Sequence, residues 1–409
     1  MSLVIERVGS QGDGVAAGPV YVPGTLPGET VRARVGGERG ELLEVVQASP
    51  DRVAAPCPHF GDCGGCSLQH WAPGPYRAWK RELIGLALAR ERIETEILEP
   101  FASPPGSRRR LALHARAGST GRAKLGYKVR GGWRLVEINV CPIADPRLQA
   151  AFPQLSRLAA PFLEHPRSAP TLHVTLSASG LDVDVTGVER RTGGLSADAR
   201  VRAAEAAQAM DAARVTLGGE VVYQARQPVV SIGRSSVALP PGAFLQATAE
   251  AEVAMAGFVT AAVAGAARVA DLYCGVGTFA LRLAETARVY AADASAEATA
   301  ALSSAKGATG GLKQITAEAR DLARRPMLAQ EMKGFDAVVF DPPRAGASAQ
   351  AEQIAASSVP IAIAVSCNPA TFARDARILA DAGFRLVRVL PVDQFLWSAH
   401  IELVGVFVR

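Results

Sequence analysis

The stretch Ile361-Ala-Ile-Ala-Val-Ser-Cys367-Asn-Pro-Ala-Thr-Phe-Ala-Arg-Asp375 reads as a buried strand that runs directly into a helix. Ile361 to Val365 is a short apolar run, typical of a parallel strand that is covered on both faces. Asn368 is a favoured N-cap, and Pro369 stands at the first helical position, where proline is best tolerated. The stretch therefore predicts a strand–helix unit of an α/β sheet.

Cys367 lies at the carboxyl end of this strand, just before the helix begins. In open α/β sheets, ligands bind at that edge. The positive end of a helix favours a thiolate, which is the nucleophilic form of cysteine. Cys367 is therefore a candidate nucleophile, and a small buried cysteine that only packs is the alternative at this point.

Residues from about 250 onward alternate between helical and strand patterns, which predicts a doubly wound, mostly parallel, Rossmann-like sheet in a C-terminal domain of residues 241–409. A strand that ends at Tyr273 leads into the glycine-rich turn Cys274-Gly-Val-Gly-Thr-Phe-Ala280. The next strand ends at Asp293, where a carboxylate can hold both hydroxyls of a ribose. A later strand ends in Asp341-Pro-Pro-Arg344, and His400-Ile-Glu402 begins the last one.

The bulk composition is that of a globular protein. The 409 residues are 49% hydrophobic and 20% charged, which allows two to four domains. The net charge of +5 weakly favours a polyanionic partner. The sequence has neither an apolar run long enough to span a bilayer nor a signal-peptide pattern at its start. We therefore expect a cytoplasmic protein without a membrane partner, and a monomer.

The first 52 residues alternate short β-rich runs with glycine turns, which predicts a small barrel of the oligonucleotide-binding (OB) kind. The segment from Val20 to Val31 resembles the TRAM domain of RNA-modifying enzymes. Acidic residues outnumber the arginines here, so a purely structural barrel is the alternative.

A cysteine cluster follows in Cys57-Pro-His-Phe-Gly-Asp-Cys63-Gly-Gly-Cys66. Clustered cysteines in an intracellular chain favour a metal site over disulfides. Cys141, followed by a proline, is the natural fourth ligand, since the other two cysteines belong to the α/β region. Four thiolates fit either structural zinc or an iron–sulfur cluster.

Residues 53–240 are predicted to form a central mixed β region that carries this metal site and binds RNA. A helix is expected from Tyr76 to Ile93. Phe101 to Val136 contains nine Lys and Arg and no acid, with His114, Tyr127 and Trp133 interleaved. Clustered cations with aromatics favour nucleic acid over a merely solvated face. The cations are Arg108, Arg109, Arg110, Arg116, Arg122, Lys124, Lys128, Arg130 and Arg134.

The glycine-rich turn alone leaves two classes of enzyme open. Gly-x-Gly-x-x-Ala followed by an acid at the next strand end also fits a nicotinamide-dinucleotide oxidoreductase. Such an enzyme has no need for Asp-Pro-Pro-Arg and Ser-Cys-Asn-Pro at two later strand ends, so we place it second.

Taken together, these motifs resemble the S-adenosylmethionine-dependent RNA uracil-5-methyltransferases over nearly the whole chain. The likeness is greatest to the branch that acts on 23S ribosomal RNA and carries a TRAM domain and a [4Fe-4S] cluster. The resemblance implies that Cys57, Cys63, Cys66 and Cys141 hold the cluster. It implies that Gln246, Tyr273, Asp293 and Asp341 line the S-adenosylmethionine site, with Cys367 as nucleophile and Glu402 as base.

Three further residues are uncertain within this resemblance. Thr248 and Thr278 stand where asparagine is common in the family, so their contacts are open. Asp321 is placed near the adenine. Asp293 stands where many relatives have glutamate, a longer side chain with the same role.

The chemistry implied by the resemblance explains these residue types. A thiolate that adds to C6 of uracil makes C5 nucleophilic, and a base then removes the C5 proton so that the thiolate can leave. The target base is expected to flip into the pocket. A buried Glu402 would have a raised pKa. Transfer RNA as substrate, and a non-enzymatic iron–sulfur RNA-binding protein, are the remaining alternatives.

Overall fold

The N-terminal residues form a closed five-stranded barrel in the order β1-β2-β3-β5-β4, as predicted for this region. The computed structural model describes residues 1–118, 122–189 and 194–409. Ile5, Val22 and Val31 fill the barrel. Membership in the TRAM class stays a prediction. The strands are β1 (Ser2–Val8), β2 (Gly14–Ala16), β3 (Val20–Val22), β4 (Thr30–Gly36) and β5 (Arg39–Gln47).

A mixed seven-stranded sheet forms the central part, in the order β10-β9-β8-β11-β12-β13-β14. Its strands are antiparallel except for the parallel pair β12 and β13. Its strands are β8 (Arg110–Ala117), β9 (Ala123–Lys128), β10 (Leu135–Glu137), β11 (Thr171–Ser177), β12 (Gly180–Thr186), β13 (Arg214–Leu217) and β14 (Glu220–Gln224). Its helices are α2 (Pro146–Ala150), α3 (Phe152–Ala159), η1 (Ala160–Leu163) and α4 (Ala197–Ala209).

The hairpin of β15 (Val229–Ile232) and β16 (Ser235–Ala238) leads into a nine-stranded C-terminal sheet. Strands β19, β18, β17, β20 and β21 run parallel, and β23 lies antiparallel between β21 and β22. The predicted doubly wound, mostly parallel sheet is therefore confirmed. Seven of its strands are β17 (Arg268–Leu272), β18 (Arg288–Asp293), β19 (Ile315–Ala319), β20 (Ala337–Phe340), β21 (Ile361–Ser366), β22 (Arg385–Asp393) and β23 (Glu402–Val408).

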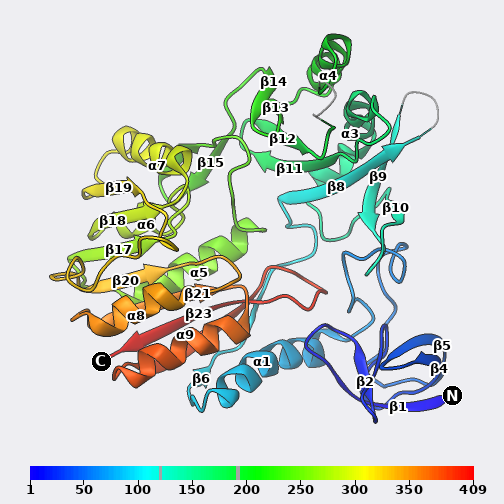
Figure 1. The fold of residues 1–409 in the computed structure, drawn as a ribbon, viewed down its shortest axis with the longest axis horizontal. Helices are drawn as coiled ribbons and strands as arrows, with labels where there is room; N and C mark the ends of the chain where they lie inside the picture. The colour runs from blue at the N-terminus through cyan, green and yellow to red at the C-terminus, as the bar shows by residue number, and fades with distance from the viewer. Residues whose placement is uncertain (119–121, 190–193) are drawn as a thin grey trace.

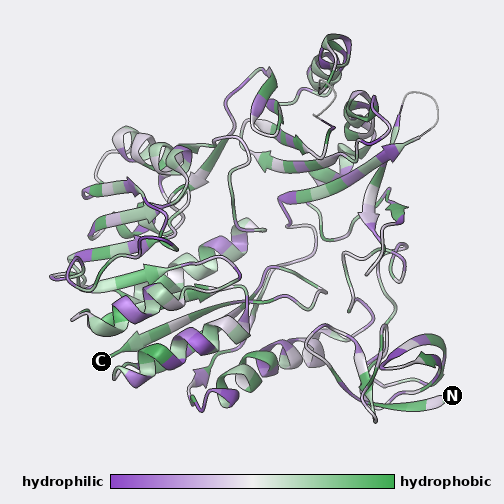
Figure 2. Cartoon of the chain, viewed as in Figure 1, coloured by the Kyte–Doolittle hydropathy of each residue, from purple (hydrophilic) through white to green (hydrophobic). Residues whose placement is uncertain are grey.

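Helices cover both faces of this sheet (Figure 1). Because side chains alternate along a strand, Ile363 of β21 packs in one core while the next residue, Ala364, packs in the other. Figure 2 shows the apolar strands of this sheet between helices that carry both apolar and polar residues. One face bears α5 (Ala249–Ala262), α6 (Ala280–Leu283) and α7 (Ala296–Ala308), and the other bears α1 (Pro73–Arg90), α8 (Ser348–Ala356) and α9 (Pro369–Asp381).

Residues that precede the central sheet contribute to the C-terminal one. The short strands β6 (Glu96–Ile97) and β7 (Phe101–Ala102) both pair with β22. Ile84 of α1 lies in the same core as Leu379 of α9, and the two helices run along the same face (Figure 1). The division at residues 52 and 240 stays a prediction, and residues 73–102 lie with the C-terminal sheet.

Helix α1 begins and ends three residues earlier than the predicted helix Tyr76 to Ile93. Its buried face includes Lys80, a charged residue that periodicity would place outside. Within residues 1–118, 122–189 and 194–409, no helix has both the length and the apolar character that crossing a membrane requires.

Candidate active site

A cavity of about 930 Å³ opens at the carboxyl ends of the parallel strands. Small-molecule sites usually measure about 300–1,000 Å³ and lie at this edge of an α/β sheet. The cavity brings together residues that are more than 150 positions apart in the chain. All six residues predicted for catalysis and cofactor binding line it: Gln246, Tyr273, Asp293, Asp341, Cys367 and Glu402.

Cys367 follows β21 and precedes α9, as predicted. The side chain of Asn368 accepts a hydrogen bond from the Ala370 N–H (3.1 Å) and so caps the helix. Burial, together with the carboxylates of Glu402 and Asp341, raises the pKa of Cys367 to about 11. Burial and the two acids thus act against the helix N-terminus, which favours a thiolate at this position.

Glu402 is the first residue of β23 and is only 5% exposed. Strand β23 lies between β21 and β22, so Glu402 is on an interior strand and not on an exposed edge of the sheet. Burial raises the pKa of Glu402 to about 8, and the charge of Asp341 adds to this shift. Such a carboxyl can accept and release a proton near neutral pH.

Gln246 and Asp341 lie together in the cavity wall. The Nε2 of Gln246 is 3.4 Å from Oδ2 of Asp341. Burial raises the pKa of Asp341 to about 7, and the hydrogen bond from Gln246 lowers it in part. Gln394, which sequence analysis did not single out, donates to Oε1 of Gln246 (2.7 Å) and to Oε1 of Glu402 (3.1 Å).

The glycine-rich turn and the two strands beside it form the other wall. Tyr273 has a φ of 64°, a conformation that is strained for a residue with a side chain and often marks a functional site. The carboxylate of Asp293 accepts hydrogen bonds from the N–H groups of Gly275 (2.9 Å) and Ser295 (2.8 Å). A carboxylate has further acceptor capacity, so these two bonds leave Asp293 able to bind hydroxyls.

The structure places Thr248, Thr278 and Asp321, whose roles the resemblance left open, in three different surroundings. Asp321 lines the cavity. Thr248 is buried as the N-cap of α5, where its Oγ1 lies 2.7 Å from Oγ of Ser103 and accepts from the Ala251 N–H. The main chain of Thr278 accepts a hydrogen bond from Arg282, and the residue lies outside the cavity lining.

A second groove of about 920 Å³ meets the first cavity at Cys367 and Arg344, which line both. Its walls come from the barrel, through Arg7 and Tyr21, and from α1, through Trp79. Cys367 is thus reachable from two sides, one lined by the strand ends and one lined by the barrel.

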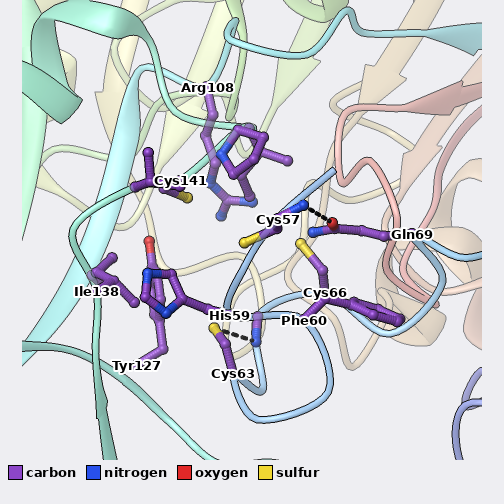
Figure 3. Close-up of a pocket in the computed structure, with 15 residues that line it drawn as sticks. Cys57, His59, Phe60, Cys63, Cys66, Gln69, Arg108, Tyr127, Ile138 and Cys141 are labelled. Atoms are coloured by element: carbon purple, nitrogen blue, oxygen red, sulfur yellow. Dashed lines mark hydrogen bonds between the residues drawn. The ribbon is translucent and has the colours of Figure 1, made fainter. Parts of the chain in front are cut away.

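The four cysteines of the predicted metal site line one smaller cavity of about 230 Å³ (Figure 3). Burial and the nearness of the other three cysteines together raise the pKa of Cys66 to about 12, as expected for four thiols grouped around one cavity. The loop is held close to the central sheet, because the Gly64 N–H donates to the Lys128 carbonyl (3.0 Å). A Cβ on Gly64 would lie 2.6 Å from that oxygen, so only glycine fits.

The described cysteines are all free thiols. Among the described residues, His, Cys, Asp and Glu side chains form no group of three or more that is arranged to hold a metal ion. The predicted iron–sulfur cluster is therefore unconfirmed.

Three arginines of the predicted RNA-binding stretch are turned toward the protein. Arg109 pairs with Glu252 and donates to the main-chain carbonyl of Gln246. Arg110 donates to the Leu245 carbonyl (2.7 Å), and Arg108 to the Arg110 carbonyl (2.9 Å). These contacts fix the segment before α5 against the central sheet. Arg109 is held by an acidic partner, whereas Arg108 and Arg110 each give one donor group to the main chain, so binding of RNA phosphates by this triplet stays a prediction.

The other cations between Phe101 and Val136 differ in their surroundings. Residues 119–121 of this stretch lie outside the described part of the chain. Arg130 pairs with Asp13 of the barrel. Arg122 and Lys124 are exposed, and among the described residues neither has an acidic partner. Trp133 is exposed beside Lys128, while Tyr127 lines the cysteine cavity.

Comparisons with known proteins agree with this geometry. Residues 229–409 match the family model described as tRNA (uracil-5-)-methyltransferase. A protein of Caulobacter vibrioides named an uncharacterized RNA methyltransferase is 62% identical, with 100% of this chain and 99% of the relative covered. The 23S rRNA (uracil(1939)-C(5))-methyltransferase RlmD of Halomonas elongata is 35% identical, with 98% of this chain and 88% of the relative covered. The chain belongs to the RNA uracil-5-methyltransferases.

A solved structure of another methyltransferase has the same fold as this chain. The tRNA (uracil-54, C5)-methyltransferase of Pyrococcus abyssi, in complex with S-adenosyl-L-homocysteine, superposes with a TM-score of 0.74. It is 24% identical and is covered over 99% of its chain and 100% of this one. The protein is thus an RNA methyltransferase, as the resemblance in the sequence implied, and it has the fold of this S-adenosyl-L-homocysteine complex.

Two residues of the methyltransferase site were missed by sequence analysis. Arg344 stood in the Asp-Pro-Pro-Arg motif, so the motif already carried a signal for it. Gln394 follows the apolar strand β22 and has no local motif. It reaches the site because the turn after β22 brings it beside Glu402 of the neighbouring strand.

Proposed function

We propose that this methyltransferase methylates C5 of a uridine in 23S ribosomal RNA through a covalent adduct with Cys367. The observation that carries the proposal is that Cys367 and Glu402 stand at the ends of adjacent strands and line one cavity. A nucleophile and a base are then available to the same pyrimidine ring.

The residue roles follow from the chemistry of the ring. The sulfur of Cys367 forms a bond to C6, and the electron pair of the C5–C6 double bond moves toward O4 as an enolate. C5 then takes the methyl group. A carboxylate of Glu402 removes the C5 proton, the double bond re-forms and the C6–S bond breaks. Because the resting thiol has a pKa of about 11, it must lose its proton before attack, and it regains one on release.

S-adenosylmethionine supplies the methyl group when it is bound. We assign its binding to Gln246, Tyr273, Asp293 and Asp341, because these residues line the strand-end cavity and do not line the groove that leads to the barrel. Asp293 would accept the ribose hydroxyls. Asp341, with a pKa of about 7, adds a negative charge beside the cofactor when it is ionised.

RNA would reach Cys367 through the groove between the barrel and α1. This groove is lined by Arg7, Arg90 and Arg344, which can contact phosphates, and by Tyr21 and Trp79. A flipped uridine would enter the active site from this side. The relative with a printed ribosomal RNA substrate is 35% identical over nearly the full chain, which favours ribosomal RNA. The fold neighbour acts on tRNA, so tRNA is the second candidate.

The cysteine cavity would hold a [4Fe-4S] cluster through Cys57, Cys63, Cys66 and Cys141. A single zinc ion needs four sulfurs about 2.3 Å from one point. The four cysteines line one cavity of about 230 Å³, which leaves room for a group larger than one ion. Tyr127 and Ile138 close the cavity with apolar surface. Bound there, the cluster would join the loop before α1 to the central sheet.

Mapping of 5-methyluridine tests the proposal directly. Ribosomal and transfer RNA from cells with and without this protein would be digested and sequenced by mass spectrometry. Loss of one or more 5-methyluridines from 23S rRNA is expected. Loss from tRNA alone would move the second candidate to first place, and an unchanged map in both RNAs would refute the proposed activity in these cells.

A further inference from the structure

Gln394 is a buried amide that stands between the two walls of the active site. It is 3% exposed. Its Oε1 accepts a hydrogen bond from the main-chain N–H of Ala247 (2.7 Å). Its Nε2 donates to Oε1 of Gln246 (2.7 Å) and to Oε1 of Glu402 (3.1 Å). The side chain therefore bridges the proposed base and a residue proposed to bind the cofactor.

The direction of these bonds is fixed by the main chain. An N–H group can only donate, so the carbonyl of Gln394 must face Ala247 and its NH2 must face Gln246 and Glu402. The carbonyl of Gln246 then accepts, so its own NH2 faces Asp341 (3.4 Å). The result is a chain of hydrogen bonds with one polarity from Ala247 to Asp341.

The residue before Gln394 is anchored by α1. Asp393 forms a fully buried ion pair with Lys80 (2.8 Å) and accepts from the Tyr76 hydroxyl (2.7 Å). Lys80 also donates to the main-chain carbonyl of His400, and Tyr76 accepts from the Trp397 N–H (2.8 Å). Both arms of the loop between β22 and β23 are thus tied to α1.

We propose that Gln394 is a positioning residue that orients the carboxylate of Glu402 for removal of the C5 proton and links it to Gln246. The inference rests on the proposed role of Glu402 as the base. The hydrogen bond to Oε1 restricts rotation of the carboxylate. Among the described residues, Oε2 receives no such bond, so it is the oxygen that is open to take a proton.

The same hydrogen bond stabilises the charged form of Glu402. It lowers the pKa, in opposition to burial and to the charge of Asp341. The charged and titratable groups on the elements around Glu402 are Asp341 after β20, Cys367 after β21, the Lys80–Asp393 pair, His400 before β23, and the ion pairs Arg109–Glu252 and Arg374–Asp375 at α5 and α9. Gln394 is the neutral donor among them.

The variant Gln394→Met keeps the size of the side chain and removes its hydrogen bonds. kcat and the KM for RNA and for S-adenosylmethionine would be measured from pH 6 to 10. Positioned bases contribute about 10²–10⁴-fold, so a partial loss of about tenfold or more in kcat is expected. The acidic limb should move to higher pH, because Glu402 would lose a bond that favours its charged form. A covalent protein–RNA complex should accumulate on a denaturing gel.

Gln350→Met is the matched control. Gln350 is also a fully buried amide of this domain, and among the described residues its side chain bonds to the main chain of Met327, outside the cavity. Its variant should show unchanged pH dependence and no trapped complex. Gln394→Glu is a second, isosteric test: an acceptor replaces the donor, so the acidic limb should move further than in Gln394→Met.

The outcomes distinguish the positioning role of Gln394 from the role of Glu402 as the base. If Gln394→Met folds and has the pH profile and trapped fraction of Gln350→Met, the positioning role is refuted. Loss of kcat without a pH shift or a trapped complex in both Gln394 variants would also refute it, because that is the effect of a merely structural residue. If Glu402→Gln itself turns over normally, the proposed base is wrong, whatever the Gln394 variants do.

Discussion

Cys367 and Glu402 face each other across two antiparallel strands, one residue beyond the last paired residues. Ser366 of β21 pairs with Leu403 of β23, so the next residue outward on each strand is Cys367 on one and Glu402 on the other. Opposed residues on adjacent antiparallel strands have Cβ atoms about 4.5–5.5 Å apart. The proposed nucleophile and base are thus set by sheet register and not by a flexible loop.

This arrangement predicts opposite effects for the two residues. Cys367→Ala should form no covalent RNA complex and transfer no methyl group, because the bond to C6 cannot form. Glu402→Gln keeps the shape of the side chain and removes its basicity. It should methylate once and remain attached to the product, which a denaturing gel with substrate RNA and S-adenosylmethionine would show as a slow band.

The double variant Cys367→Ala, Glu402→Gln is the control for this band and should lack it. A band that survives loss of Cys367, or normal turnover by Glu402→Gln, would contradict the assignment of roles.

The raised pKa of Glu402 predicts a pH-dependent stability. The carboxyl has a pKa of about 8 in the folded protein against 4.5 as the reference value, so the folded state holds its proton more tightly. This contribution is fully present below pH 4.5 and is lost as the pH rises through 8. Glu402→Gln has no carboxyl to ionise, so it does not lose this stability as the pH rises. Its free energy of unfolding relative to wild type should therefore increase from pH 5 to pH 8, on the order of a few kcal/mol.

Thermal unfolding at both pH values measures this difference. Glu41→Gln, an exposed change on the barrel, serves as the control for a charge lost at the surface. If the Tm difference between Glu402→Gln and the wild type is the same at pH 5 and at pH 8, burial does not disfavour the charged form of Glu402.

Binding of S-adenosylmethionine tests the role of Asp293. Hydrogen bonds to charged groups contribute about 1.5–3 kcal/mol, so Asp293→Ala should raise the Kd for S-adenosylmethionine by about tenfold or more in calorimetry. Asp336→Ala is the matched control, because Asp336 likewise accepts from two main-chain N–H groups (2.8 and 2.9 Å), at the opposite end of β17. Tight binding of NAD by the wild type would instead support the nicotinamide alternative.

The sequence predicted what depends on local pattern. Tyr273, Asp293, Asp341 and Cys367 each follow an apolar run, so their shared edge could be derived from the strand ends. The pKa of Cys367 could not, because it depends first on burial in the folded protein and then on carboxylates that reach it from other strands.

Long-range contacts account for the other differences. Lys80 precedes its partner Asp393 by 313 residues, and no local pattern links them. The charge of Arg109 was visible in the sequence, but its pairing with Glu252 arises only where the central sheet meets α5. The partners of Gln394 also come together only in the folded chain, so its sequence context could not distinguish it from any other polar residue in a turn.

The cysteine cavity predicts the metal content of the protein. Anaerobically purified protein should be brown and contain iron and acid-labile sulfide in equal amounts, because four thiols surround one cavity. Cys141→Ala should lose this iron, while Cys274→Ala, a buried cysteine outside the cavity, should keep it. Colourless protein with one zinc per chain would contradict the cluster.

The groove between the barrel and α1 predicts where RNA binds. Arg7 is exposed and lines this groove, and it does not line the strand-end cavity. If Arg7 contacts a phosphate, Arg7→Ala should weaken RNA binding and reduce the slope of log Kd against log salt by roughly one unit. The Kd for S-adenosylmethionine should stay the same. Arg34→Ala is the control, since Arg34 lies on the barrel outside the groove, paired with Glu41 (2.8 Å). An unchanged salt slope for Arg7→Ala would place the phosphate contacts elsewhere, and an equal change for both variants would indicate only a loss of net charge.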